Sequence, residues 1–142
     1  DALPDSSTPM RLKAGRALAI AVPEEKVAAV QALWQAHTSL PLNNLETPAL
    51  PADLKLPGRP AKPLLKPPKD VPTRSPFTQE GLAALLHAVC HIEFNAINLA
   101  LDAVWRFNHM PDAFYVDWLR VAYEESQHFD MLHRHLQRIG WR

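Results

Sequence analysis

Apolar residues recur every three or four positions along two long stretches in the second half of the chain. This spacing places them on one face of a helix, and it predicts helices from about Thr78 to Asn108 and from Asp112 to Ile139. Thr78 suits the N-cap of the first helix, and Gly140 suits the position just past the end of the second. Because only three residues separate the helices, we expect an antiparallel hairpin. Its apolar rows are Leu82, Leu86, Val89, Ile97, Ala100, Val104 and Phe107, and then Phe114, Trp118, Val121, Leu132 and Leu136.

A shorter helical hairpin is predicted in residues 1–40. Residues 11–22 are rich in Ala, Leu and basic side chains, and Pro23 suits the first turn of a second helix. In that second helix Val27, Val30 and Trp34 recur at helical spacing, and His37 is expected to cap their apolar stripe. Residues 1–9 are polar and are expected to fray.

Residues 41–76 contain ten of the fourteen prolines, which nearly excludes regular helix or central strand. We expect an extended strap across the helices, anchored by Leu54, Leu56, Leu64 and Leu65. The alternative is a basic proline-rich ligand for a partner module. The predicted fold class is therefore all-α, with an N-terminal helical segment (1–40), a proline-rich strap (41–76) and a long helical hairpin (77–142).

Composition narrows the classes of partner and compartment. The chain is 47% hydrophobic and 21% charged, enough for one domain with a modest core. A net charge of zero gives no electrostatic reason to expect nucleic acid or a membrane as the main partner. No apolar run approaches the roughly 20 residues that span a bilayer, so we expect no membrane partner. The single cysteine, Cys90, excludes an internal disulfide and favours the cytoplasm.

Three residues that are neither apolar nor small interrupt the apolar rows of the long hairpin. Glu93 lies in the first row, and Glu125 and His128 lie three positions apart in the second, so the latter two share a helical face. At 1.5 Å per residue, Glu93 stands about 22 Å from the turn, Glu125 about 20 Å and His128 about 24 Å. In an antiparallel hairpin all three therefore reach the same height.

Charged groups inside an apolar row are costly unless they are paired or bind a metal. One interpretation is a Glu–His hydrogen bond with a second carboxylate nearby. However, two carboxylates at one level repel each other unless they are protonated or metal-bound. A Glu on one helix and Glu-x-x-His on the next also make half of the ligand set of a dimetal bundle. We therefore predict that Glu93, Glu125 and His128 bind metal.

Other polar residues near these rows have simpler explanations. Glu124 is one residue off the row and could pair with Arg120 or support the metal ligands. His135 could reach the same row but is expected to cap the bundle. His87 and His91 are expected at the surface or between helices, and Cys90 as a small buried residue. Three further residues could support the ligands without independent evidence: Tyr123, Asn95 and Asn98.

The segments HIEFNAINLALDAVWRF (91–107) and MPDAFYVDWLRVAYEESQHFDML (110–132), with PGRPAKP (57–63) before them, resemble a bacterial ferritin-like family of unknown function. More distantly, the EE-x-x-HF pattern is similar to that of bacterial tRNA-modifying hydroxylases. The resemblance implies a four-helix bundle whose metal ligands include the positions of Glu93, Glu125 and His128. It also implies a second hairpin with its own Glu and Glu-x-x-His, which is absent from these 142 residues.

The leading hypothesis is a non-haem di-iron, or iron/manganese, oxidoreductase that acts with dioxygen or peroxide. Its substrate would be an unknown small molecule or a modified nucleoside, and no catalytic residue is assigned beyond the three ligands. The alternatives are metal binding or storage without turnover, and a metal-free helical interaction module. Because half of the ligand set is missing, the expected partner is a second copy of the chain or the missing second hairpin.

Overall fold

The structure, a computed structural model, describes residues 8–42, 45–58 and 78–140. These residues form four α-helices and no β-strand: α1 (Met10–Ala19), α2 (Pro23–Ala36), α3 (Gln79–Arg106) and α4 (Asp112–Arg138). A 3₁₀ turn, η2 (His37–Ser39), follows α2. The predicted all-α class is confirmed.

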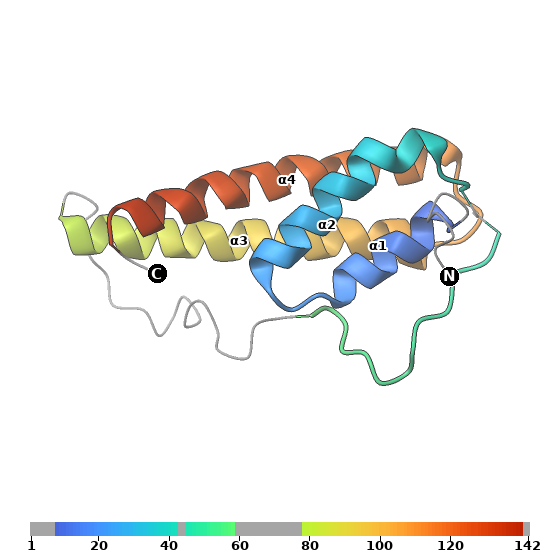
Figure 1. Cartoon of the computed structure of the whole chain (residues 1–142), viewed down its shortest axis with the longest axis horizontal. Helices are drawn as coiled ribbons and strands as arrows, with labels where there is room; N and C mark the ends of the chain where they lie inside the picture. Colours follow the sequence, from blue (N-terminus) through green and yellow to red (C-terminus); the bar gives the residue numbers. More distant parts are fainter. Residues whose placement is uncertain (1–7, 43–44, 59–77, 141–142) are drawn as a thin grey trace.

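The two long helices lie side by side as an antiparallel hairpin, and the two short helices form a second hairpin against it (Figure 1). α1 packs on α3, and α2 packs on α4. Figure 1 shows the short hairpin beside the part of α3 and α4 nearest their turn, so their other ends extend past it. One flank of the long hairpin is therefore covered by the chain's own N-terminal segment.

The ends of the long helices follow the predicted local chemistry. The side chain of Thr78 accepts a hydrogen bond from the backbone N–H of Gly81 at 2.9 Å, which confirms the N-cap. Gly140 adopts a φ of 85°, the left-handed conformation in which glycine avoids the strain of a Cβ. Between the helices, the Tyr115 hydroxyl donates to the Phe107 carbonyl at 2.7 Å and fixes the turn.

The core lies between the two hairpins, and it uses a slightly different face of each long helix from the one predicted. In α3 and α4 the most deeply buried apolar residues are Ala83, Cys90, Phe94, Ile97, Ala100, Leu101 and Val104, and then Tyr115, Leu119, Ala122, Phe129 and Leu136. Of the predicted rows, Ile97, Ala100, Val104 and Leu136 are buried, whereas Phe107 remains 47% exposed and Trp118 38% exposed. The buried face of each long helix is turned away from the predicted row because α1 and α2 cover the flank around Phe94 and Leu119. Glu93, Glu125 and His128 consequently lie beside the core rather than inside it.

α1 is shorter than predicted and ends at Ala19 rather than near Val22. Its C-cap residue Ile20 is extended, and the Ile20 N–H donates to the Ala17 carbonyl. The chain needs this break because Pro23 begins α2 and the two helices must reverse direction. After α2, His37 stacks on Trp34 with ring centroids 4.2 Å apart, in line with the predicted cap of the apolar stripe.

The described part of the strap, residues 45–58, contacts the helices, but through anchors other than the predicted leucines. The Pro48 carbonyl accepts from the Trp105 indole N–H at 2.8 Å, and the Gly58 N–H donates to the Leu18 carbonyl at 2.8 Å. Leu54 and Leu56 remain 39% and 38% exposed, so neither is deeply buried, although Leu56 lies beside Leu18 of α1. Leu64 and Leu65, and the predicted frayed end at residues 1–7, lie outside the described residues.

Among the described residues, α3 alone is long and apolar enough to cross a membrane by length and composition. Its most apolar 18-residue window has a mean hydropathy of 1.3, and 28% of that window is buried. Core helices of soluble proteins pass the same test, so one such helix does not establish a membrane span. The expectation of a protein without a membrane partner stays a prediction.

Candidate metal centre

Glu93 of α3 and the Glu125–His128 pair of α4 converge at mid-height of the long hairpin. His128 Nδ1 lies 3.4 Å from Glu125 Oε1 and 3.9 Å from Glu93 Oε1. One potential ligand atom from each of the three residues lies within 4.8 Å of the others. The predicted convergence of these side chains, which followed from register alone, is confirmed as geometry.

The cluster lies on the flank of the long hairpin that α1 and α2 leave uncovered. The side chains of Glu93 and Glu125 are 19% and 26% exposed, and that of His128 is 55% exposed. Val121 and Leu132, each about one turn from the cluster on α4, are partly buried against the core. The cluster is thus a polar spot within an apolar strip, open to solvent on one side.

The direct contact between His128 and Glu125 is a long one. At 3.4 Å it exceeds the usual N–H···O range of 2.7–3.2 Å. The hydrogen bond between these two side chains is therefore weak.

Most of the other polar residues singled out from the sequence lie away from the cluster. Arg120 pairs with Asp117 at 3.1 Å and lies over the Trp34 ring, so the predicted Glu124–Arg120 pair is wrong. Tyr123 stacks on the same ring, with its hydroxyl accepting from the amide of Gln127. His135 contacts the guanidinium of Arg138.

The two asparagines of α3 do not support the ligands either. The Asn98 side chain bonds to Lys26 of α2, and Asn95 lines a pocket beside α1 and the strap. The predicted supporting role of both residues is therefore wrong. Cys90 is buried as expected, and burial raises the pKa of its thiol to about 11.

Two buried cations were missed by the sequence argument. Arg11 and Lys26 are both fully buried, although each belongs to a short helix that was interpreted only by its apolar spacing. Arg11 bonds to the last turn of α3, and Lys26 bonds to Asn98 and to the Leu18 carbonyl. Each could have been found as a charged residue within the apolar face of a helix, the pattern by which Glu93 was selected.

A protein of Haemophilus influenzae named "Uncharacterized protein" is 47% identical to this chain over 134 residues. That match covers 88% of this chain and 46% of the relative, so the chain spans less than half of the relative's length. No solved structure matches the chain. Residues 19–142 match the family described as "Protein of unknown function (DUF455)", and the chain belongs to that family.

Proposed function

We propose that this protein binds iron or manganese through Glu93, Glu125 and His128, and that it is a ferritin-like dimetal carboxylate protein with oxidoreductase activity. The observation that carries the proposal is the convergence of two carboxylates and one imidazole from two helices within 4.8 Å. A Glu on one helix and Glu-x-x-His on the next make half of the ligand set of such a bundle. The similarity of both long helices to a ferritin-like family supports the same assignment.

The spacing of the three side chains fits a transition metal after small rotations. Metal–ligand bonds of about 2.0–2.2 Å place neighbouring ligand atoms roughly 3–3.5 Å apart. The separations from His128 Nδ1 are 3.4 and 3.9 Å, so little movement is needed. Two carboxylates with one imidazole suit iron and manganese. The single cysteine, Cys90, is buried in the core and offers no thiolate to the cluster.

Each residue has a defined task in this proposal. Glu93 and Glu125 would hold the metal with negatively charged oxygens from two different helices. The exposed imidazole of His128 would supply a nitrogen ligand at the solvent side of the cluster. Iron, when bound, would supply redox chemistry toward dioxygen or peroxide. The substrate, a small molecule or a modified nucleoside, would approach from that open side.

Three protein ligands do not complete a dimetal centre, and the open flank is where further ligands would enter. A second helical hairpin placed there would face Glu93, Glu125 and His128 directly. A second copy of the chain would supply this hairpin, or, in longer relatives, the segment that lies outside the match with this chain. The Haemophilus relative, of which the match covers only 46%, has room for such a segment.

The test is metal analysis of protein purified without chelators and then loaded with ferrous iron or manganese under anaerobic conditions. We expect bound metal in the wild type and a loss of about tenfold or more in affinity for His128→Ala. His135→Ala, one heptad further along α4, removes an imidazole outside the cluster and should retain the metal. If wild type and both variants stay metal-free after loading, the proposed site is wrong.

A further inference from the structure

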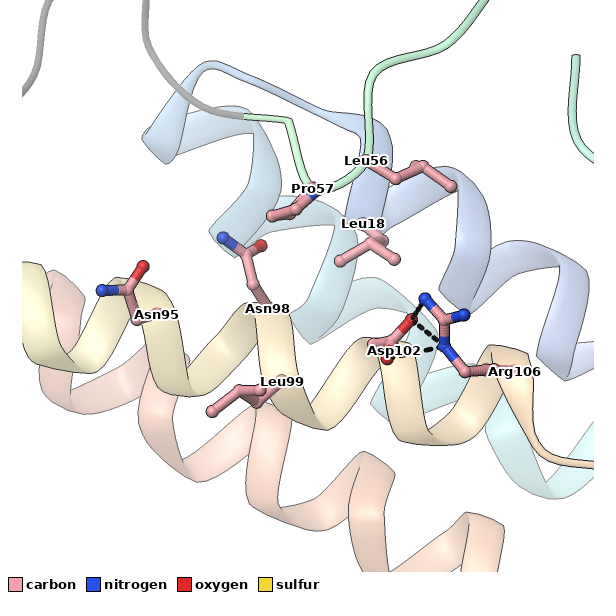
Figure 2. A pocket seen from close by; sticks show the side chains of 8 residues that line it. All are labelled: Leu18, Leu56, Pro57, Asn95, Asn98, Leu99, Asp102 and Arg106. Atoms are coloured by element: carbon pink, nitrogen blue, oxygen red, sulfur yellow. Dashed lines mark hydrogen bonds and ion pairs between the residues drawn. The ribbon is translucent and has the colours of Figure 1, made fainter. Parts of the chain in front are cut away.

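A second candidate site lies on the opposite flank of α3. A pocket of about 400 Å³ opens between α1, residues 56–57 of the strap and α3 (Figure 2). This volume falls within the range of roughly 300–1,000 Å³ that small-molecule sites occupy. Leu18, Leu56 and Pro57 form an apolar wall, and α3 contributes Asn98 and an Asp102–Arg106 ion pair. The pocket thus combines an apolar surface with a few polar groups, as ligand sites do.

Asn98 presents an unsatisfied donor in this pocket. The residue is only 3% exposed, and its Oδ1 accepts a hydrogen bond from Lys26 Nζ. Because an ammonium group can only donate, this bond fixes the orientation of the amide. Asn98 Nδ2 is then buried without a hydrogen-bond partner among the described residues. In Figure 2 the amide projects from α3 toward the segment that carries Pro57.

The structure around the amide is rigidly built. Lys26 is fully buried and donates to the carbonyls of Leu18 at 2.9 Å and Gly58 at 3.4 Å. Gly58 lies so close to α1 that an added Cβ would stand 2.2 Å from the Ala19 carbonyl oxygen. The Asn98 amide is therefore held by a cation that is itself bonded to α1 and to the strap.

The charges around the pocket favour an anionic acceptor. The ammonium of Lys26 bonds to the amide oxygen and so polarises Nδ2 toward a negatively charged partner. At the rim, Arg106 contacts Asp102 through Nε at 3.0 Å and Nη2 at 2.9 Å, which offsets the charge of that carboxylate. An incoming carboxylate consequently meets a polarised donor and no uncompensated negative charge from Asp102.

We propose that this pocket binds a small carboxylate with a short aliphatic tail. The carboxylate accepts a hydrogen bond from Asn98 Nδ2, and the tail packs on Leu18, Leu56 and Pro57. Asn98 follows Glu93 by five positions, which is about 140° around the helix axis. The ligand therefore does not touch the candidate metal centre, and the proposal is independent of the proposed function.

The test uses the ¹⁵N- and ¹³C-labelled, metal-free protein and sodium butyrate as the probe. We expect butyrate to shift the Asn98 side-chain amide protons saturably. Butyramide, which has a similar tail but a neutral carbonyl, should bind about tenfold or more weakly because it loses the charge-assisted bond. Asn98→Asp keeps the acceptor for Lys26 but replaces the donor by a carboxylate, and it should abolish saturable shifts of the Leu18 and Leu56 methyl groups.

Gln127→Glu makes the same amide-to-carboxylate change on the exposed face of α4, and it should bind butyrate as the wild type does. Equal binding by Asn98→Asp and the wild type would overturn the proposal, because the Nδ2 donor would then play no part. Butyrate that leaves the Asn98 amide unshifted, with Nδ2 in contact with water alone, would overturn it too. Butyramide binding as tightly as butyrate would exclude the carboxylate as the recognised group.

Discussion

The guanidinium of Arg11 closes the C-terminal end of α3. It donates to the Val104 carbonyl at 3.1 Å, to the Trp105 carbonyl at 2.8 Å and to the side chain of Asn108 at 3.0 Å. Further bonds to the Glu46 carbonyl and to Thr47 attach the strap to the same cation. Burial lowers the pKa of Arg11, yet these oxygens and the negative end of the α3 dipole stabilise its charge.

Replacing Arg11 by Met should therefore destabilise the protein strongly. Several buried carbonyls lose their donor, and we expect a loss of about 3 kcal/mol in the free energy of unfolding. The measurement is urea denaturation followed by circular dichroism. Arg16→Met, an exposed position on the same helix, is the matched control and should change stability by less than about 0.5 kcal/mol. Equal midpoints for the two variants would contradict the importance of the buried cation.

His87 gives the fold a dependence on pH. Burial lowers the pKa of this imidazole from its ordinary value of 6.5, and the charge of His133 opposes its protonation further. Above about pH 6.5 both folded and unfolded chains carry a neutral His87. As the pH falls, the unfolded chain takes up the proton first, so stability decreases.

We expect the wild type to lose more stability between about pH 7.5 and about pH 5.5 than His87→Gln does. Urea midpoints at the two pH values measure the difference. His91→Gln, four positions further along α3, controls for the loss of a histidine from this helix. The prediction is wrong if His87→Gln shows the same pH dependence as the wild type.

At the scale of the elements, the ends of the long helices could be predicted from the sequence, but the face of each helix that is buried could not. Thr78, Gly140 and the three-residue turn define the ends of the long helices, and these ends set the register of Glu93 against Glu125. Which flank of the hairpin is buried depends on where α1 and α2 dock. That docking rests on contacts between distant segments, such as Arg11 with Val104, which periodicity within one helix does not reveal.

For the strap, too, the sequence predicted the local conformation but not the tertiary contacts. Its proline content predicted extended chain, but its anchors are backbone groups and small residues, which carry no pattern. Gly58 is the tightest of these, because only a residue without a Cβ fits against the Ala19 carbonyl. The Gly58 N–H bond to Leu18 and its carbonyl bond to Lys26 then hold the strap on α1 and α2.

Gly58→Ala should release this contact and destabilise the fold by about 1–3 kcal/mol, the usual effect of overpacking. Limited proteolysis with trypsin is a local measurement, because Lys55 lies in the exposed chain three residues before the glycine. We expect faster cleavage after Lys55 in Gly58→Ala than in the wild type. Ala52→Gly, in the exposed part of the strap, is the control. Unchanged cleavage in Gly58→Ala would show that the strap is not held at this point.

At the scale of the molecule, the uncovered flank of the long hairpin is the dominant feature. Leu85 and Ile92 of α3 are 49% and 62% exposed, and Phe107 just after α3 and Trp118 of α4, which line one apolar pocket, are 47% and 38% exposed. Soluble monomers rarely leave so many large apolar side chains together in water. The strip also contains Glu93, Glu125 and His128, so whatever covers it also lies over the candidate metal centre.

We expect a second copy of the chain to cover this flank in a two-fold arrangement. Its own Glu93, Glu125 and His128 would then face the first set and complete four carboxylates and two imidazoles, the complement of a dimetal bundle. Light scattering during metal titration should show a dimer that metal strengthens. Val121→Arg, beside the cluster, should give a monomer, whereas Val22→Arg, at the exposed turn between α1 and α2, should not. A wild type that stays monomeric at micromolar concentration, with and without metal, would contradict the dimer. If that monomer still bound metal, the missing half of the bundle would have to come from a second hairpin, for which the longer Haemophilus relative has room.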